Sequence, residues 1–155
     1  MCGIVGVLDT VDSNSEKMQH TINRMSQTLT HRGPDAQGIW ISQEDKISLG
    51  HRRLSILELS EHGAQPMSSV CGRYMLTFNG EIYNHQQIRQ LLKAEKEFAF
   101  NGHSDTETLI AAIEVWGIAE TLQRLTGMFA FAVWDKVDQR LTLARDRVGE
   151  KPLYY

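Results

Sequence analysis

Two continuous apolar runs stand out in the pattern of hydrophobic and polar positions along the chain. They are GIVGVL (residues 3–8) and GMFAFAVW (residues 127–134), both rich in β-branched or aromatic residues. Runs of this length are too short for most helices and are typical of strands buried on both faces. Shorter apolar segments bounded by turn residues complete the predicted strands: QGIWIS (37–42), KISLG (46–50), RYMLTFNG (73–80) and the hairpin return LTLAR (141–145).

Three further segments carry apolar residues at helical spacing. The first begins near Ser13–Ser15, and the second follows Asn84, a favoured N-cap. The third opens with the capping box Ser104–Glu107 and is predicted to end at Gly117. The residues predicted to face inward are Met18, Ile22, Met25 and Leu29 in the first helix, Ile88, Leu91 and Leu92 in the second, and Leu109, Ile110, Ile113 and Trp116 in the third.

Doubly buried strands combined with amphipathic helices require more than two layers. Two packed sheets flanked by helices satisfy this requirement, and so does a doubly wound parallel sheet. The hairpin-like spacing of the strands favours mostly antiparallel sheets. A chain of 155 residues has the length of a single domain.

Composition narrows the function classes. The net charge of −3 and the pI of about 6.1 give no basic footprint for nucleic acid or a membrane surface. The start of the chain lacks the pattern of a signal peptide, and no apolar run reaches transmembrane length. With only two cysteines, a disulfide framework is not expected and a reducing cytoplasm fits best. The histidines show no metal-ligand spacing, so no metal site is predicted.

The chain ends in RDRVGEKPLYY, an apolar and aromatic stretch without a polar tail. This pattern is typical of a strand interrupted by the end of the sequence. We therefore expect residues 1–155 to be one domain truncated at its C-terminal end. The alternative is a natural C-terminus that docks into the core.

The first residues, MCGIVG, place a cysteine directly behind the initiator methionine. If Met1 is removed, which a small residue at position 2 permits, Cys2 carries a thiol and a free α-amine on one residue. An N-terminal amine that serves as the base for its own side chain is an established way of activating a nucleophile. The alternative is a small apolar residue that begins the first strand.

Three other motifs allow both a structural and a catalytic interpretation. HRGPD (31–35) is either a helix-ending turn with a local ion pair or a loop at a site edge, where Arg32 pairs with a carboxylate. Asn79-Gly80 favours a tight hairpin turn, but an amide and a backbone N–H can also form an oxyanion hole, with Glu81 beside them. Asp105 in the capping box either stabilises the helix dipole or binds a substrate ammonium.

In order along the chain, MCGIVG, HRGPD, RRLSI, NGEIYN, HSDTE, GMFAFAVWD and ARDRVGEKPLYY form a recognisable string. It closely resembles the N-terminal class II glutamine amidotransferase (glutaminase) domain of the glutamine-hydrolysing asparagine synthetase family. The resemblance covers nearly the whole chain. It implies an α+β, four-layer αββα N-terminal nucleophile (Ntn) hydrolase fold with two packed antiparallel sheets, and an enzyme without a cofactor in this chain.

The resemblance also implies a role for individual residues. Cys2 would be the nucleophile, and Asn79 and Gly80 would form the oxyanion hole. Arg53 would bind the glutamine α-carboxylate, and Glu81 and Asp105 the α-ammonium. Three residues are expected around them: Leu54 and Ile56 lining the pocket with backbone groups, and Arg32 supporting the site.

Family members pass ammonia to a second, ATP-dependent domain that amidates aspartate, and ATP and Mg are expected there. That domain is absent from this sequence, so the same glutaminase could instead feed a sugar or a natural-product acid. A catalytically dead structural module is the third hypothesis, although Cys2, Arg53 and Asn79 are all present. Dimers occur in the family, but no segment identifies an interface.

Overall fold

The computed structural model describes residues 2–9, 14–54, 63–95 and 98–155. No helix in this part of the chain is long and apolar enough to cross a membrane. The elements in chain order are β1 (Gly3–Leu8), α1 (Ser15–Thr28), β2 (Ala36–Ser42), β3 (Ile47–Arg53), β4 (Met67–Ser68), β5 (Tyr74–Ile82), α2 (His85–Glu95), α3 (Asp105–Arg124), β6 (Gly127–Asp135) and β7 (Arg140–Arg145).

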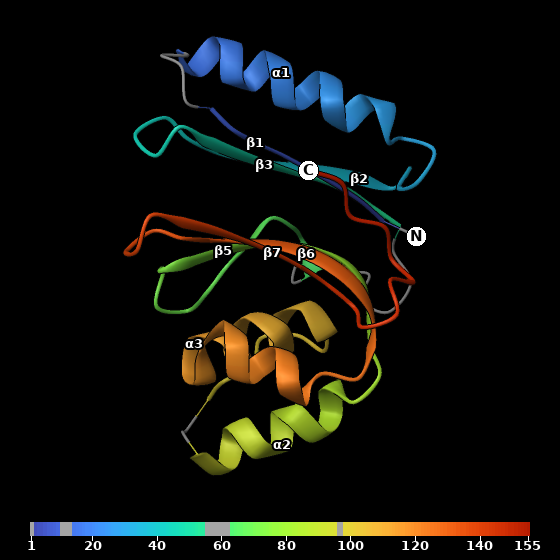
Figure 1. Cartoon of the computed structure of the whole chain (residues 1–155), viewed down its shortest axis with the longest axis vertical. Helices are drawn as coiled ribbons and strands as arrows, with labels where there is room; N and C mark the ends of the chain where they lie inside the picture. The colour runs from blue at the N-terminus through green and yellow to red at the C-terminus, as the bar shows by residue number, and fades with distance from the viewer. Residues whose placement is uncertain (1, 10–13, 55–62, 96–97) are drawn as a thin grey trace.

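The described strands form two antiparallel sheets that pack face to face. The first sheet has the order β1-β3-β2 and the second the order β4-β5-β6-β7. Helix α1 covers the outer face of the first sheet, and α2 and α3 lie on the outer side of the second (Figure 1). The predicted four-layer αββα fold with antiparallel sheets is therefore confirmed.

Two apolar clusters of described residues fill the space on either face of the second sheet. The larger lies between the second sheet and its helices and includes Leu76, Phe78, Leu109, Ile113 and Phe131. The smaller lies between the sheets and is built from Ile47, Leu49, Met75, Ala132 and Trp134. Strand β6 contributes to both cores, because its alternate side chains enter the two layers. The prediction that residues 127–134 form a doubly buried strand is confirmed.

For residues 3–8, the prediction of a strand is confirmed, but the prediction that both of its faces are buried is wrong. The strand is present, but its side chains are mostly half-buried, and Leu8 is exposed. The reason is its place at the edge of the first sheet, where it pairs only with β3 among the described strands. The central strand β3 is the buried one.

The three predicted helices are present, but the prediction that Leu91 faces inward is wrong: it is 46% exposed, because Ile88, Arg89 and Leu92 form the buried face of α2. Asn14 caps α1, and Ser104 Oγ accepts the Glu107 N–H across 3.2 Å at the start of α3. The predicted stop at Gly117 is confirmed as a break in the helix: its φ of 76° and ψ of 169° are non-helical, and a second helical segment follows it to Arg124. The second segment of α3 returns Ile118 and Leu122 to the larger core.

Candidate active site

A cavity of about 170 Å³ opens where the two sheets and the start of α3 meet. Its described lining comes from seven separate segments of the chain. Among the described residues these are Cys2 before β1; His51, Arg53 and Leu54 from the end of β3; Gly63 and Gln65; Phe78, Asn79, Gly80 and Glu81 from β5; Ser104, Asp105 and Thr106 at the start of α3; and Met128 and Lys151.

Strand alternation explains why polar side chains gather between the sheets. In β3, Ile47 and Leu49 enter the core between the sheets, so His51 and Arg53 follow on the same face. In β5, Thr77 Oγ1 donates to the Gly50 carbonyl across 3.4 Å, which identifies the odd-numbered residues as those that face the first sheet. Asn79 and Glu81 therefore face the first sheet as well.

Cys2 is held against the end of β3. The Leu54 N–H donates to Cys2 Sγ across 3.4 Å, and the same sulfur lies 3.8 Å from the Leu54 carbonyl oxygen. Because Gly3 pairs with Arg52, Cys2 lies level with Arg53 on the neighbouring strand. The Cys2 thiol is half-buried and not in a disulfide.

Asn79 and Gly80 do not form a turn. They lie inside the nine-residue strand β5, opposite Ala130 and Phe129 of β6. The turn prediction is wrong because β6 continues the pairing past both residues. A Cβ atom at Gly80 would overlap the Met128 carbonyl oxygen and lie 2.6 Å from the Phe129 Cα. Glycine is therefore required here by the close approach of two strands, not by a turn.

The edge of β5 that faces away from β6 carries alternate backbone N–H groups. Tyr83 N–H donates to the Thr126 carbonyl just before β6, so the odd-numbered residues of β5 are the ones that exchange backbone hydrogen bonds with β6. The N–H groups of Phe78, Gly80 and Ile82 point the other way. Strand β4 does not reach them, because it pairs only as far as Leu76.

Side chains replace the missing strand on both sides of Gly80. Phe78 N–H donates to Gln65 Oε1 across 2.6 Å, and Ile82 N–H donates to Asp105 Oδ2 across 2.9 Å. No hydrogen bond joins the Gly80 N–H, which lies between them, to another described residue. This edge therefore leaves one donor beside the cavity that also contains the Cys2 thiol.

Charges of both signs line the cavity. Asp105, at the first position of α3, is only 6% exposed, and Arg53 and Glu81 are half-buried. Burial raises the pKa of Asp105, while the Ile82 N–H and the nearby His85 act in the opposite direction. The described lining contains one arginine, one lysine and two carboxylate residues, so it offers partners for both charges of a zwitterion, whose ammonium would favour the ionised form of Asp105.

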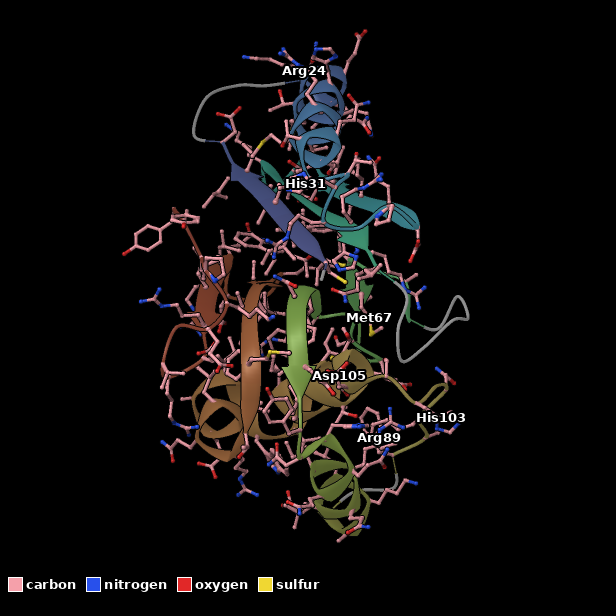
Figure 2. The ribbon with its side chains drawn as sticks, turned by 90° about the vertical axis from the view of Figure 1, so that its right-hand side faces the viewer. Arg24, His31, Met67, Arg89, His103 and Asp105 are labelled. Carbon is pink, nitrogen blue, oxygen red and sulfur yellow. The ribbon has the colours of Figure 1, made fainter. Side chains whose placement is uncertain are left out.

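Asp105 is held in place by a buried arginine from α2. Arg89 donates to the carbonyls of Gly102 (2.7 Å) and Ser104 (2.9 Å) and to Thr108 Oγ1 (2.7 Å). It also pairs with Glu107 across 3.1 Å. Figure 2 shows Arg89 below Asp105, between α2 and the start of α3.

The histidines near the site differ in exposure. His103 is exposed at the edge of the molecule (Figure 2). His51 is 1% exposed and lines the cavity, and its Nε2 has no hydrogen-bond partner among the described residues. Burial lowers the pKa of His51 to about 4, so its imidazole is neutral at pH 7. Its position two residues before Arg53 on one strand is the signal that would have identified it.

Gln65 and Lys151 also line the cavity, and sequence analysis did not identify either. Lys151 is 4% exposed, and its backbone N–H donates to Asp146 Oδ2 across 2.9 Å. Asp146 also accepts the N–H groups of Phe129 and Glu150. This carboxylate thus shapes the turn of the RDRVGEK segment that brings Lys151 to the cavity.

Two of the expected site residues are not in the described lining. Arg32 lies half-buried in the loop after α1. That loop contacts the end of β3 through its backbone: Gly33 O accepts from Arg52 Nε (2.9 Å), and Asp35 N–H donates to the Arg53 carbonyl (3.0 Å). Ile56 lies outside the described residues. The described chain has no group of three or more His, Cys, Asp or Glu residues that could hold a metal ion.

Similarity to known proteins identifies the family of the chain. The family model of the glutamine amidotransferase domain matches residues 1–155. Asparagine synthetase [glutamine-hydrolyzing] 1 of Bacillus subtilis (strain 168) is 42% identical over 156 residues, which cover 100% of this chain and 24% of that protein. Amidase chry2 of Gibberella zeae is 36% identical over 163 residues and covers 100% of this chain and 24% of its own length.

A solved structure shares the fold. Glutamine phosphoribosylpyrophosphate amidotransferase from B. subtilis, complexed with ADP and GMP, superposes with a TM-score of 0.53 and 26% identity, covering 65% of this chain and 23% of that chain. The chain belongs to the glutamine amidotransferase domain family and has the Ntn-hydrolase fold that its sequence predicted. It spans about a quarter of the length of the curated relatives named above.

Proposed function

We propose that this domain hydrolyses glutamine with Cys2 as the nucleophile and, after removal of Met1, the α-amine of Cys2 as its base. The observation that supports this most strongly is the single cavity shared by the Cys2 thiol, Arg53, the Asn79–Gly80 pair and Asp105. These groups come from different parts of the fold, and each has a counterpart on glutamine.

The charged groups orient the substrate. The Arg53 guanidinium binds the α-carboxylate, since its planar fork matches carboxylate geometry. Asp105 and Glu81 bind the α-ammonium, and this cation offsets the cost of a buried carboxylate at Asp105. Leu54 lines the same cavity, where its backbone N–H and carbonyl contact the Cys2 sulfur. The roles of Ile56 in the pocket and of Arg32 in support rest on the sequence resemblance alone.

The chemistry follows from this orientation. The Cys2 sulfur forms a bond to the carboxamide carbon, and the carbonyl oxygen becomes an oxyanion held by the Asn79 amide and the Gly80 N–H. The C–N bond then breaks, and the departing nitrogen takes the proton that the Cys2 α-amine had accepted from the thiol. Water, deprotonated by the same amine, attacks the glutamyl thioester and releases glutamate with the thiol restored.

We further propose that the ammonia serves an ATP- and Mg-dependent synthetase domain beyond residue 155, with aspartate as the acceptor. The asparagine synthetase relative supports this, whereas the amidase relative supports the alternative of another acceptor. The two unbridged cysteines favour a cytoplasmic protein. A homodimer is proposed from the family resemblance alone.

The test is release of glutamate from glutamine by the purified protein and its cysteine variants. Cys2→Ala should abolish release, because the nucleophile is lost. Cys71→Ala is the matched control, since Cys71 is exposed and does not line the cavity. Glutamate release by Cys2→Ala at the parent rate would overturn the proposal, and an inactive parent protein would favour the dead-module hypothesis.

A further inference from the structure

Gln65 connects the open edge of β5 to α3. Its Oε1 accepts the Phe78 N–H across 2.6 Å, and its Nε2 donates to Thr106 Oγ1 across 3.3 Å. The side chain is held in one orientation because each end of the amide has its own partner. Gln65 is 8% exposed and lines the cavity.

The backbone of Gln65 is fixed as well. Its carbonyl packs against Gly38 of β2, where a Cβ atom would overlap the Gln65 oxygen. The residue is therefore anchored to the first sheet by its main chain and to the second sheet by its side chain. Few side chains in a loop have so little freedom.

The contact with Phe78 lies on the same strand edge as the Gly80 N–H. In a regular sheet, a neighbouring strand would fix this edge through its hydrogen bonds, but β4 pairs only as far as Leu76. Gln65 supplies the bond that β4 does not reach. The backbone of Phe78 also hydrogen-bonds to the buried His51, so two side chains hold this residue at the open edge of β5.

We propose that Gln65 is a positioning residue for the oxyanion hole: by holding the Phe78 N–H, it keeps the next donor on that edge, the Gly80 N–H, aimed into the cavity. This inference rests on the proposed glutaminase function. It assigns Gln65 no contact with the reacting atoms. Because a misdirected donor weakens the transition state more than the bound substrate, the expected loss is in kcat rather than in KM.

The first test is Gln65→Met, which keeps the length of the side chain and removes both hydrogen bonds that the amide makes. We expect kcat for glutamate release to fall about 10- to 100-fold, with KM for glutamine within about threefold of the parent value. Gln65→Glu keeps an oxygen that accepts the Phe78 N–H, and it should retain kcat within about threefold.

A binding measurement separates positioning from general loss of structure. An aldehyde analogue of glutamine forms a tetrahedral adduct with Cys2, and its oxygen takes the place of the oxyanion. Gln65→Met should weaken this adduct by about the factor lost in kcat, while affinity for glutamate, which needs only the α-group contacts, should not change. The matched control is Arg73→Gln, which removes the Arg73–Asp135 pair at the other end of β5 and β6 and should leave kcat unchanged.

Each outcome is decisive. Parent-like kcat and adduct affinity in Gln65→Met would overturn the inference, and so would an equal loss of kcat in Arg73→Gln. If Gln65→Met does not fold, Gln65→Asn takes its place: the shorter side chain no longer reaches the Phe78 N–H, and an unchanged kcat there would overturn the inference. A parent protein that does not hydrolyse glutamine would instead refute the proposed function.

Discussion

The backbone N–H of Leu54 donates to the Cys2 sulfur across 3.4 Å, and Leu54 directly follows Arg53. The candidate nucleophile and the candidate carboxylate-binding residue are thus fixed by the same pairing of β1 with β3. Their spacing does not depend on a flexible loop. A substrate whose carboxylate is bound by Arg53 therefore presents its far end at a set position relative to the thiol.

Arg53 and its neighbour Arg52 offer a direct comparison on one strand. Arg52 lies on the opposite face, where it bonds to the Gly33 carbonyl and to Gln37. Arg53→Gln should raise KM for glutamine about 10- to 100-fold, because a charge-assisted bond to the α-carboxylate is lost. Arg52→Gln should change KM by less than about threefold. Steady-state kinetics of both variants decide, and equal effects would contradict the assignment.

Asp105→Asn should separate stability from binding. Burial raises the pKa of Asp105, so above that pKa the ionised carboxylate destabilises the folded protein, and a neutral amide relieves this cost. The Asn oxygen can still accept the Ile82 N–H. We expect the free energy of unfolding at pH 7 to stay level or rise, while KM for glutamine increases at least about 10-fold.

The control for this variant is Asp135→Asn at the other end of the second sheet. Asp135 pairs with Arg73 across 2.6 Å, so its loss should lower stability without changing KM. Denaturant unfolding and glutamate release measured on both variants give the comparison. A marked loss of stability in Asp105→Asn would show that its charge is not a cost to the fold.

Gly80→Ala tests the close approach of β5 and β6. The added methyl would overlap the Met128 carbonyl oxygen and crowd the Phe129 Cα, and neither backbone atom can move without distorting the sheet. We expect a loss of about 3 kcal/mol or more in unfolding free energy. Gly72→Ala is the reference: its φ is 75°, and nothing lies within 4 Å of the new methyl, so only about 1 kcal/mol of backbone strain is expected.

His51 predicts a pH dependence of stability. Burial lowers its pKa in the folded state to about 4, from the ordinary histidine value of 6.5. Between these values the unfolded chain binds the proton and the folded protein does not, so stability falls as pH drops from 6.5 towards 4, by about 3 kcal/mol. The carboxylates also titrate near the lower limit. The difference between the parent and His51→Asn isolates the histidine, and equal slopes of unfolding free energy against pH would contradict its burial in the neutral form.

Most of the fold could be predicted because local pattern and tertiary structure agree. The apolar run at residues 127–134 has no polar face to expose, so it becomes the strand shared by both cores. Asn79-Gly80 misled the prediction, since this dipeptide favours a turn in isolation, and only the length of the pairing with β6 overrides that preference. The edge position of β1 likewise depends on sheet order, which the local pattern does not encode.

The site was predictable to the extent that the residues sit in motifs. Cys2, Arg53, Asn79, Glu81 and Asp105 belong to such strings, and the structure brings all of them to one cavity. Gln65, by contrast, belongs to no recognised motif. Its role depends on where β4 stops pairing with β5 and on the absence of a side chain at Gly38, which allows the Gln65 carbonyl to pack there. Contacts that depend on the absence of a neighbouring strand cannot be inferred from residue spacing.

The most direct measurement is mass spectrometry of the protein quenched during turnover of glutamine. The account predicts that the N-terminal peptide begins at Cys2, without Met1, and carries one glutamyl group as a thioester in the parent and in Cys71→Ala, but not in Cys2→Ala. Full glutaminase activity in a protein that retains Met1, or a glutamyl group attached to any residue other than Cys2, would contradict it.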